Sequence, residues 1–293
     1  MKYKLSIITV TYKPDHIVLT QCIDSILKYN DIGDLLQIII VDNSPTNESI
    51  IPSFQKKYKN IVFIPAPENK GFGYSNNIGV KASNSDYILI FNNDTEIIEP
   101  IFSRLIRKLE KNPLIGCIGI KQAYGYPSFF KRPESKISYI KMKRDIANGK
   151  YNNHDYFIPG AFMFMKTSVF IEAGMFDENI FMYHEDPDLC KRILNKGYEI
   201  IYDSQISFFH KTGQRHSFSD KTYKISLESY IYYMEKYNYN HLIKPNLLKT
   251  IRFMKIKGLV FLLLFKKNIA FQLFKGASIH KSALDNYLKK ISQ

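Results

Sequence analysis

The sequence predicts an α/β fold, in which a Rossmann-like and mostly parallel sheet is followed by a basic helical tail. Continuous apolar runs rich in β-branched residues, such as Leu5–Val10 and Leu36–Val41, are typical of buried parallel strands. The segment between them, Ile17–Tyr29, carries apolar residues at helical spacing and completes a βαβ unit. From Leu227 onward, aromatic and aliphatic runs alternate with Lys and Arg, which predicts basic helices.

The composition indicates a globular protein with an anionic partner. Of 293 residues, 45% are hydrophobic and 23% are charged, and the formal net charge is +14. Such a charge suits nucleotide phosphates, nucleic acid or an acidic membrane surface. The three cysteines, Cys22, Cys117 and Cys190, lie too far apart to predict a disulfide framework or a zinc site. Because Met1–Leu5 lacks a signal-peptide pattern, we expect a cytosolic location.

A glycine-containing loop follows the third expected strand, Ile61–Ile64, which a helix over about Glu48–Tyr58 precedes. The loop begins at Asn69, and its early glycines permit a tight turn while Lys70 offers a cation. Helical spacing resumes over Ser75–Ala82, so the pattern predicts a phosphate-facing loop that enters a helix. The glycine spacing does not match the dinucleotide-binding fingerprint.

Polar side chains follow the second strand and the fourth strand, Tyr87–Phe91. Because carboxyl ends of parallel strands form the ligand-binding edge, Asp42 is expected to accept a hydrogen bond from a base or ribose. Asp94, beside the amides of Asn92 and Asn93, predicts an oxygen-rich site for a divalent cation that holds a diphosphate. Two simpler alternatives remain open: Asp42 caps the next helix, and the Asn-Asn-Asp segment is an ordinary turn.

The second half of the domain is expected to add strands and a long excursion. Tyr124–Asp155 is polar and aromatic, and we expect acceptor contacts or a mobile flap there. The remaining expected elements are a helix over Glu99–Leu109, a strand over Ile115–Ile120, a strand over Phe157–Met165, a helix over Val169–Ala173, and strands over Gly197–Tyr202 and Ile206–Gly213. In the strand over Phe157–Met165, Gly160 marks a close backbone approach.

The most acidic stretch of the chain is Phe181–Arg192. Glu185 and Asp186 are adjacent, so one side chain can face a reaction centre while the other supports it. Helical spacing begins there, which places both carboxylates at a positive helix N-terminus. The alternative is an ordinary helix cap.

These motifs, in this order, resemble the family 2 inverting glycosyltransferases of the GT-A fold, and most closely the bacterial branch that contains many rhamnosyltransferases. The likeness extends over about residues 5 to 215. The matching segments are Val10–Tyr12, Val41–Ser44, Asn69–Phe72, Asn76–Gly79, Phe91–Asp94, Gly160–Phe162 and Glu185–Asp186.

The resemblance implies a role for each candidate residue. It assigns donor nucleotide binding to Thr11, Tyr12, Asp42, Lys70, Asn77, Asn92 and Asn93. Asp94 matches the last, metal-binding residue of the D-x-D motif, whereas Asn92 stands at its first position and removes one anionic ligand. Asp186 becomes the catalytic base, with Glu185 orienting it or the acceptor, or taking its place as the alternative.

Further roles follow from the same resemblance. Gly160 and Ala161 face the donor sugar and the acceptor. His210 becomes a candidate metal or diphosphate ligand, although a lone histidine after an apolar strand is commonly structural. The segment Lys211–Ser219, with Arg215 and His216, is a candidate lid over the phosphates.

The predicted function is therefore that of an inverting, hexosyltransferase-type glycosyltransferase. It would move one sugar from a UDP- or dTDP-sugar, with dTDP-L-rhamnose among the candidates, to a hydroxyl of a growing surface glycan on a polyprenyl diphosphate lipid. We expect Mn²⁺ or Mg²⁺ as cofactor and no nucleic-acid partner, and a homodimer is left open. The alternatives are a metal-dependent nucleotidyltransferase and a non-catalytic binder of anionic membrane or nucleic acid.

The expected domains are a GT-A domain over residues 1–222 and a basic helical tail over residues 223–293. The first has a nucleotide-binding half over about 1–96 and an acceptor half over about 97–222. In the tail, Gly258–Phe265 is far shorter than the roughly 20 residues needed to span a bilayer, and basic residues flank it. This predicts an interfacial helix on the inner face of the cell membrane, and the alternative is a helical hairpin that packs on the enzyme or forms a dimer contact.

Overall fold

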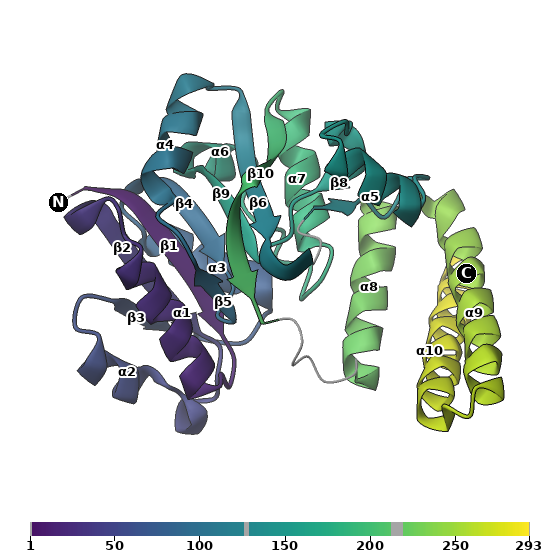
Figure 1. Ribbon diagram of the computed structural model, residues 1–293. Coiled ribbons are helices and arrows are strands. Elements are labelled where there is room, and N and C mark those ends of the chain that lie inside the picture. Colours follow the sequence, from purple (N-terminus) through teal and green to yellow (C-terminus); the bar gives the residue numbers. More distant parts are fainter. Residues whose placement is uncertain (1, 126–128, 212–218, 293) are drawn as a thin grey trace. The chain divides into compact units, whose positions relative to one another are not determined.

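The computed structural model describes residues 2–125, 129–211 and 219–292, which fall into two compact units (Figure 1). The first unit comprises the described residues up to Phe181 together with those from Glu185 to Lys211. The second comprises Met182–His184 and the described residues from Ser219 onward.

The first unit is built on one large, mostly parallel sheet, which confirms the predicted α/β class (Figure 1). Among the described residues, eight strands lie in the order β3-β2-β1-β4-β9-β6-β10-β5. Within this sheet, β9 and β5 run antiparallel to their neighbours. The strands are β1 (Tyr3–Thr11), β2 (Leu36–Asp42), β3 (Val62–Pro65), β4 (Ser85–Phe91), β5 (Thr95–Ile97), β6 (Ile115–Gln122), β9 (Phe162–Lys166) and β10 (Glu199–His210), with β7 (Phe130–Lys131) and β8 (Tyr156–Phe157) forming a separate pair.

Helices cover both faces of the sheet. The helices of this unit are α1 (His16–Lys28), α2 (Ile51–Lys57), α3 (Phe72–Ala82), α4 (Phe102–Lys111), α5 (Tyr139–Ala147), α6 (Thr167–Glu172) and α7 (Glu185–Asn195). Buried side chains of α1, α2 and α4 join one hydrophobic cluster, and those of α3, α5, α6 and α7 join another. Along β1, Leu5 and Ile7 point into the first cluster and Ile8 into the second, as the twofold period of a strand requires.

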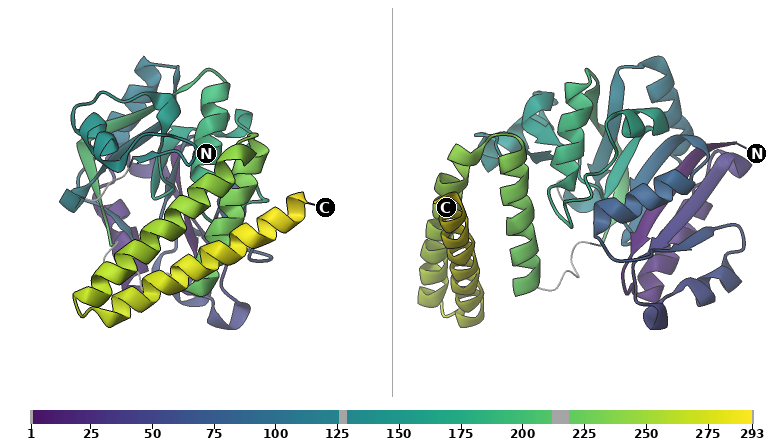
Figure 2. Two further views of the ribbon diagram at one scale, coloured as in Figure 1. Left: turned by 90° about the vertical axis from the view of Figure 1, so that its right-hand side faces the viewer. Right: turned by 180° about the vertical axis from the view of Figure 1, so that it is seen from behind.

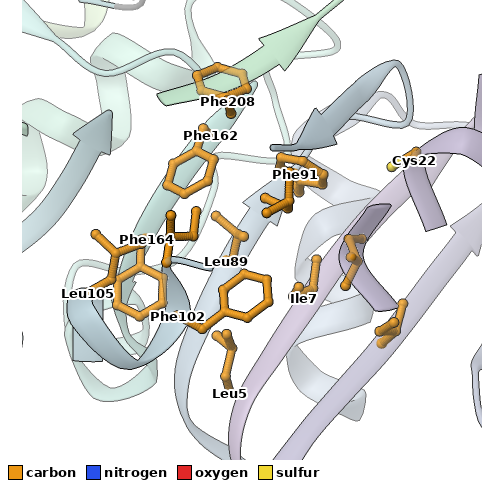
Figure 3. Close-up of a cluster of buried hydrophobic side chains, with 14 of the residues drawn as sticks. Leu5, Ile7, Cys22, Leu89, Phe91, Phe102, Leu105, Phe162, Phe164 and Phe208 are labelled. Carbon is orange, nitrogen blue, oxygen red and sulfur yellow. The ribbon is translucent and has the colours of Figure 1, made fainter. Parts of the chain in front are cut away.

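The first cluster supports three strand ends with aromatic rings that pack against one another (Figure 3). The ring of Phe162 lies 5.9 Å from that of Phe91 and 5.2 Å from that of Phe208. All three rings are almost fully buried. Because close-packed interiors deform little, the ends of β4 and β10 and the start of β9 are held firmly relative to one another.

Two expected strand boundaries were wrong. The run Phe157–Met165 is divided into β8 and β9 by a turn at Gly160–Ala161, because Pro159 lacks the N–H that a central strand position must donate. The expected break before Ile206 is absent, since β10 continues through a register irregularity after Asp203. Here the backbone N–H of Gln205 donates to the Asp203 carboxylate at 2.9 Å, which satisfies the chain where the ladder is interrupted.

The second unit is a three-helix assembly with a core of its own, in agreement with the predicted helical tail. Its helices are α8 (Asp220–Lys236), α9 (Asn240–Leu263) and α10 (Lys267–Ile291). Figure 2 shows α9 and α10 side by side as an antiparallel hairpin. Its core includes Tyr233, Leu247 and Leu284. Within the described residues, no helix is both long and apolar enough to cross a membrane.

Candidate functional site

Most of the predicted site residues lie at one edge of the large sheet. β1, β2 and β4 pair in parallel, so Thr11, Asp42 and Asn92 stand at neighbouring carboxyl ends. β9 runs antiparallel to β4, which brings Gly160 and Ala161 to the same edge before β9 begins. The backbone N–H of Asn92 donates to the carbonyl of Ala161 at 3.3 Å and joins the two segments directly.

Asp42 is buried at the end of β2, where its carboxylate accepts hydrogen bonds from several protein groups. Oδ1 accepts from the hydroxyls of Thr11 at 2.9 Å and Ser44 at 2.6 Å, and from the Ser44 backbone N–H at 3.1 Å. Oδ2 accepts from the Ser49 hydroxyl at 2.7 Å and from the Ile50 N–H at 3.3 Å. A nucleotide that bonded to this carboxylate would therefore displace or share one of these donors.

Tyr12 and Lys13 form the exposed part of the same corner. Half of the Tyr12 side chain is exposed, at 52%, and the Lys13 ammonium lies 5.7 Å from its ring centre. Lys13 has a φ of 45°, and its backbone N–H donates to the Ser44 hydroxyl at 2.7 Å. The loops after β1 and β2 are thus tied together, with an aromatic ring available to a planar ligand.

Asp94 and His210 are brought together from segments more than a hundred residues apart. The Asp94 Oδ1 and His210 Nε2 atoms are 3.1 Å apart. The Lys211 backbone N–H also donates to the Asp94 carbonyl at 2.9 Å, and the Lys211 ammonium lies 3.9 Å from a carboxylate oxygen of Glu96. The pairing of β10 with β5 produces this approach, since it places His210 opposite Thr95.

The donor set of Asp94 and His210 fits a divalent cation that keeps several ligands from outside the protein. Among the described residues, no group of three or more His, Cys, Asp or Glu side chains could hold a metal ion. Mg²⁺ in particular is commonly held by one or two protein carboxylates together with water and substrate phosphates. The geometry thus allows a cation bound jointly with a diphosphate.

The loop before α3 packs against the segment that leads into α7. Gly71 has a φ of 101°, and a Cβ on it would lie 1.7 Å from the Phe181 carbonyl oxygen, so only glycine fits. The Phe72 N–H donates to that same carbonyl at 2.9 Å. Lys70 forms an ion pair with Glu68 at the exposed surface, so the expected phosphate contact requires its ammonium to move or share this partner.

Asp186 lies at the start of α7 against Gly160, which makes the expected close backbone approach. A Cβ on Gly160 would lie 2.8 Å from Asp186 Oδ1 and 2.8 Å from the Phe72 ring. Among the described residues, Asp186 Oδ1 is shielded from solvent without a hydrogen-bond partner, and so is Glu185 Oε2. Buried carboxylate oxygens without donors are rare in folded proteins, and they leave both groups ready to accept a proton.

Burial dominates the electrostatics of this carboxylate pair. It raises the pKa of Asp186 to about 7, although the nearby backbone N–H of Gly160 opposes the rise. Burial also raises the pKa of Glu185 well above its ordinary value, and the neighbouring charge of Asp186 adds to the effect. A carboxylate with a pKa near neutrality can both hold and release a proton at cellular pH.

The three residues before Glu185, which we call the strap, are held by α8. Tyr183 and His184 both have positive φ values, 67° and 70°, which are uncommon for residues other than glycine. Ser229 of α8 donates from its hydroxyl to the Met182 carbonyl at 2.9 Å, and the His184 ring lies 5.7 Å from that of Tyr230. The strap therefore belongs to the second unit, and the chain passes from it directly into α7.

The remaining predicted site residues are Asn77, Asn93 and those of the predicted lid. Asn77 is buried, where its amide donates to the Phe176 carbonyl and to Glu178 at 2.9 and 3.1 Å, so its role toward a donor stays a prediction. Asn93 is half-buried in the turn after β4. The predicted lid, with Arg215 and His216, lies outside the described residues apart from its ends, Lys211 and Ser219.

Several residues of this edge carried no site prediction from the sequence. Ser49 contacts Asp42 from seven residues away, and nothing in its local pattern distinguishes it. Ser44, Phe72 and Glu96 lie within motifs that the sequence analysis describes, but no role was predicted for them. In the second unit, the contact of Ser229 with the strap follows only from the packing of α8 and carries no signal in the sequence either.

Comparison with known proteins gives one matching family model and several similar curated proteins. The family model described as "Glycosyl transferase family 2" matches residues 6–174. The chain is 26% identical over 172 residues to the poly-beta-1,6-N-acetyl-D-glucosamine synthase of Staphylococcus aureus (strain COL), a match that covers 57% of this chain and 40% of that protein. It is 25% identical over 235 residues to the low-salt glycan biosynthesis hexosyltransferase Agl10 of Haloferax volcanii, covering 76% and 72%. The chain thus spans less than half the length of the first of these curated relatives.

Solved structures with the same fold come from more distant proteins. GalNAc-T7, in a crystal structure with UDP, GalNAc and Mn²⁺, matches with a TM-score of 0.60 at 15% identity, covering 83% of this chain and 51% of that one. The mannosyltransferase PcManGT from Pyrobaculum calidifontis, in complex with GDP-Man and Mn²⁺, also matches with a TM-score of 0.60, at 14% identity, covering 98% and 76%. At these identities the likeness shows the fold alone.

Proposed function

The chain belongs to glycosyl transferase family 2, and we propose that it moves a single sugar, with inversion, from a UDP- or dTDP-sugar to a hydroxyl of a growing surface glycan. dTDP-L-rhamnose is one candidate donor. The observation that carries the proposal is the hydrogen bond between Asn92 and Ala161, which joins the Asp94 turn to the Gly160 turn that touches Asp186. A candidate site for the leaving diphosphate and a candidate base therefore share one sheet edge.

Asp186 acts as the base in the proposed reaction. Its carboxylate takes the proton from the acceptor hydroxyl while the hydroxyl oxygen attacks the anomeric carbon of the donor sugar. The bond between that carbon and the diphosphate oxygen breaks on the opposite side, so the configuration at the carbon is inverted. A pKa raised to about 7 by burial gives Asp186 enough basicity to assist the attack. Glu185 orients Asp186 or, as the alternative, takes its place.

The other strand ends bind the donor in this proposal. Thr11 and Tyr12 line the base pocket, Asp42 accepts from the base or ribose, and Asn77 and Asn93 support the nucleotide. Lys70 and Asn92 approach the diphosphate, where Asp94 and His210 would hold Mn²⁺ or Mg²⁺. When bound there, a divalent cation offsets the negative charge that gathers on the departing diphosphate. The Mn²⁺ named with both solved structures supports this choice of cofactor.

The acceptor side involves the second half of the domain and a membrane. We propose a nucleotide-binding half over about residues 1–96 and an acceptor half over about 97–222, where Gly160 and Ala161 face both substrates. The names of the two curated relatives concern glycan synthesis, which supports a glycan acceptor. We propose that a polyprenyl diphosphate lipid carries it, on the inner face of the cell membrane, and that the C-terminal helices bind that surface.

A thermal-shift screen of nucleotide sugars, with and without Mn²⁺, tests the donor and metal assignments together. At a donor concentration a hundredfold above Kd, binding should raise the melting temperature by roughly 5 °C or more. Asp94→Asn should lose the part of the shift that requires Mn²⁺, whereas the control Asp34→Asn, in the turn at the opposite end of β2, should keep it. A full Mn²⁺-dependent shift in Asp94→Asn would remove Asp94 from the metal site.

A further inference from the structure

The turn between α9 and α10 exposes an unusual concentration of apolar side chains. We define the hairpin tip as residues 253–271, the last part of α9, the turn and the first part of α10 (Figure 2). It contains ten of the 22 large hydrophobic side chains that are exposed in the described chain. These ten are Phe253, Ile256, Leu259, Val260, Leu262, Leu263, Leu264, Phe265, Ile269 and Phe271.

The exposed apolar side chains do not form one face of an ordinary amphipathic helix. Leu262, Leu263, Leu264 and Phe265 are consecutive and all exposed, and Leu263 and Phe265 reach 80% and 88%. Four successive exposed apolar residues leave no polar side for water, a pattern that in soluble proteins marks a functional surface. The hairpin itself is well packed, since the Phe274 ring of α10 lies over Gly258 of α9 and the core of the unit includes Ile251 and Ala277. The tip is therefore a formed structure with an uncovered end.

The charges around the tip define the chemistry of what covers it. Between residues 236 and 284 the sequence contains no Asp or Glu. The same stretch holds ten cations, namely Lys236, Lys244, Lys249, Arg252, Lys255, Lys257, Lys266, Lys267, Lys275 and Lys281. Pairing two copies of the tip would bring these charges together without a compensating anion, which disfavours a second copy of the chain as the partner. An apolar surface ringed by cations instead complements acyl chains beneath anionic phosphates.

The lysines of the tip lie against its aromatic rings in a manner that suits an interface. The Lys257 ammonium is 5.7 Å from the ring centre of Phe253 and 5.8 Å from that of Phe261, and the Lys266 ammonium is 5.9 Å from Phe261. Long lysine side chains can thus follow apolar surface while their charged ends reach the headgroups.

We propose that the hairpin tip inserts its apolar side chains into the interfacial region of an anionic phospholipid bilayer while Lys255, Lys257, Lys266 and Lys267 bind the headgroup phosphates. This proposal specifies how the chain would bind the membrane surface named in the proposed function. It rests on that function only for its biological purpose. Lipid binding needs no sugar transfer, so the two proposals can fail separately. The sequence predicted an interfacial helix, with a hairpin packed on the enzyme or in a dimer contact as the alternative. In the structure, α9 and α10 pack on each other and leave the tip exposed.

The test is co-sedimentation of the full chain with vesicles of phosphatidylcholine alone and of phosphatidylcholine mixed with phosphatidylglycerol. We expect binding to the mixed vesicles that weakens as salt is added. The double variant Leu263→Ser/Phe265→Ser should lower the partition coefficient about tenfold or more, because two apolar side chains no longer enter the lipid. The pair Lys266→Gln/Lys267→Gln should lower it by up to about fivefold per lysine and reduce the salt dependence.

Leu114→Ser is the matched control, because Leu114 is a large apolar residue of the first unit with 57% exposure. Its binding should equal that of the wild type. Equal binding by the Leu263/Phe265 double variant, or no binding of the wild type to anionic vesicles, would overturn the proposal. Light scattering gives a further test. If the wild type is a dimer that does not bind vesicles, and the same double variant is a monomer, the tip is a contact between copies and the proposal is overturned.

Discussion

At the scale of single residues, the acidic pair at the start of α7 is maintained against an electrostatic cost. The pKa of Asp186 is raised by burial to about 7, so its charged form is less favourable in the folded protein than in the unfolded chain. An ordinary helix cap would behave in the opposite way, because helix N-terminal N–H groups stabilise a carboxylate. The two roles therefore predict opposite effects on stability.

Replacing Asp186 with Asn should preserve or raise the stability of the protein at alkaline pH. Between the ordinary pKa of 3.8 and the folded value of about 7, the folded state binds more protons than the unfolded state, so this group lowers stability as pH rises through that window. Asn removes that penalty. Thermal melts at pH 4, 6 and 8 should show a gap in favour of Asp186→Asn that opens as the pH rises. A variant that is about 1 kcal/mol less stable than the wild type at pH 8 would indicate a cap instead.

Asp42→Ala should weaken both the nucleotide corner and donor binding. The change leaves the hydroxyls of Thr11, Ser44 and Ser49 without their acceptor, at a cost of roughly 1–3 kcal/mol in stability. Steady-state kinetics below the melting range should show the donor KM rising more than kcat falls. Asp34→Ala, on an exposed turn, is the control. A defect confined to kcat would count against nucleotide recognition by Asp42.

At the scale of elements, α8 holds the strap, which precedes the acidic pair in the chain. Ser229 and Tyr230 lie on α8, and both contact the strap immediately before α7 begins. Positive φ values at two successive residues persist only where surrounding contacts hold them. The conformation of the strap should therefore depend on α8.

Ser229→Ala should lower the stability of the three-helix unit by about 1 kcal/mol, because the Met182 carbonyl loses its hydrogen-bond donor. Thermal melts should show this loss. Ser226→Ala, three residues earlier on α8, serves as the control. An unchanged melting temperature of Ser229→Ala would show that the Ser229 hydroxyl does not hold the strap.

Elements with a strong local pattern were predictable, and elements set by distant partners were not. The β-branched runs that form β1, β2 and β4 can be recognised in the sequence, because burial on both faces requires continuous apolar residues. The short β5 pairs antiparallel with β10 and has no pattern of its own. The continuity of β10 past Asp203 likewise depends on a hydrogen bond and an irregular register that only the assembled sheet defines.

At the scale of the whole molecule, the location of the site could be predicted from the sequence, but the contacts between its side chains could not. Parallel strand order predicts that Asp42 and Asp94 share an edge, and the structure places them at that edge of the sheet. The approach of Asp186 to Gly160 and the hydrogen bonds that Asp42 already accepts depend on side-chain geometry, for which local sequence carries no signal. In the C-terminal helices, too, local sequence does not show which apolar residues form the core and which are exposed at the tip.

The central claim is that this family 2 member transfers a sugar with Asp186 as the base, and the products formed from a nucleotide sugar test it most directly. Wild-type protein incubated with Mn²⁺ and UDP- or dTDP-sugars, where water takes the place of the acceptor hydroxyl, should release nucleoside diphosphate and no pyrophosphate. Asp186→Asn should bind the donor normally yet release nucleoside diphosphate about two to four orders of magnitude more slowly. Release of pyrophosphate, or near-normal turnover by Asp186→Asn beside an inactive Glu185→Gln, would contradict the account.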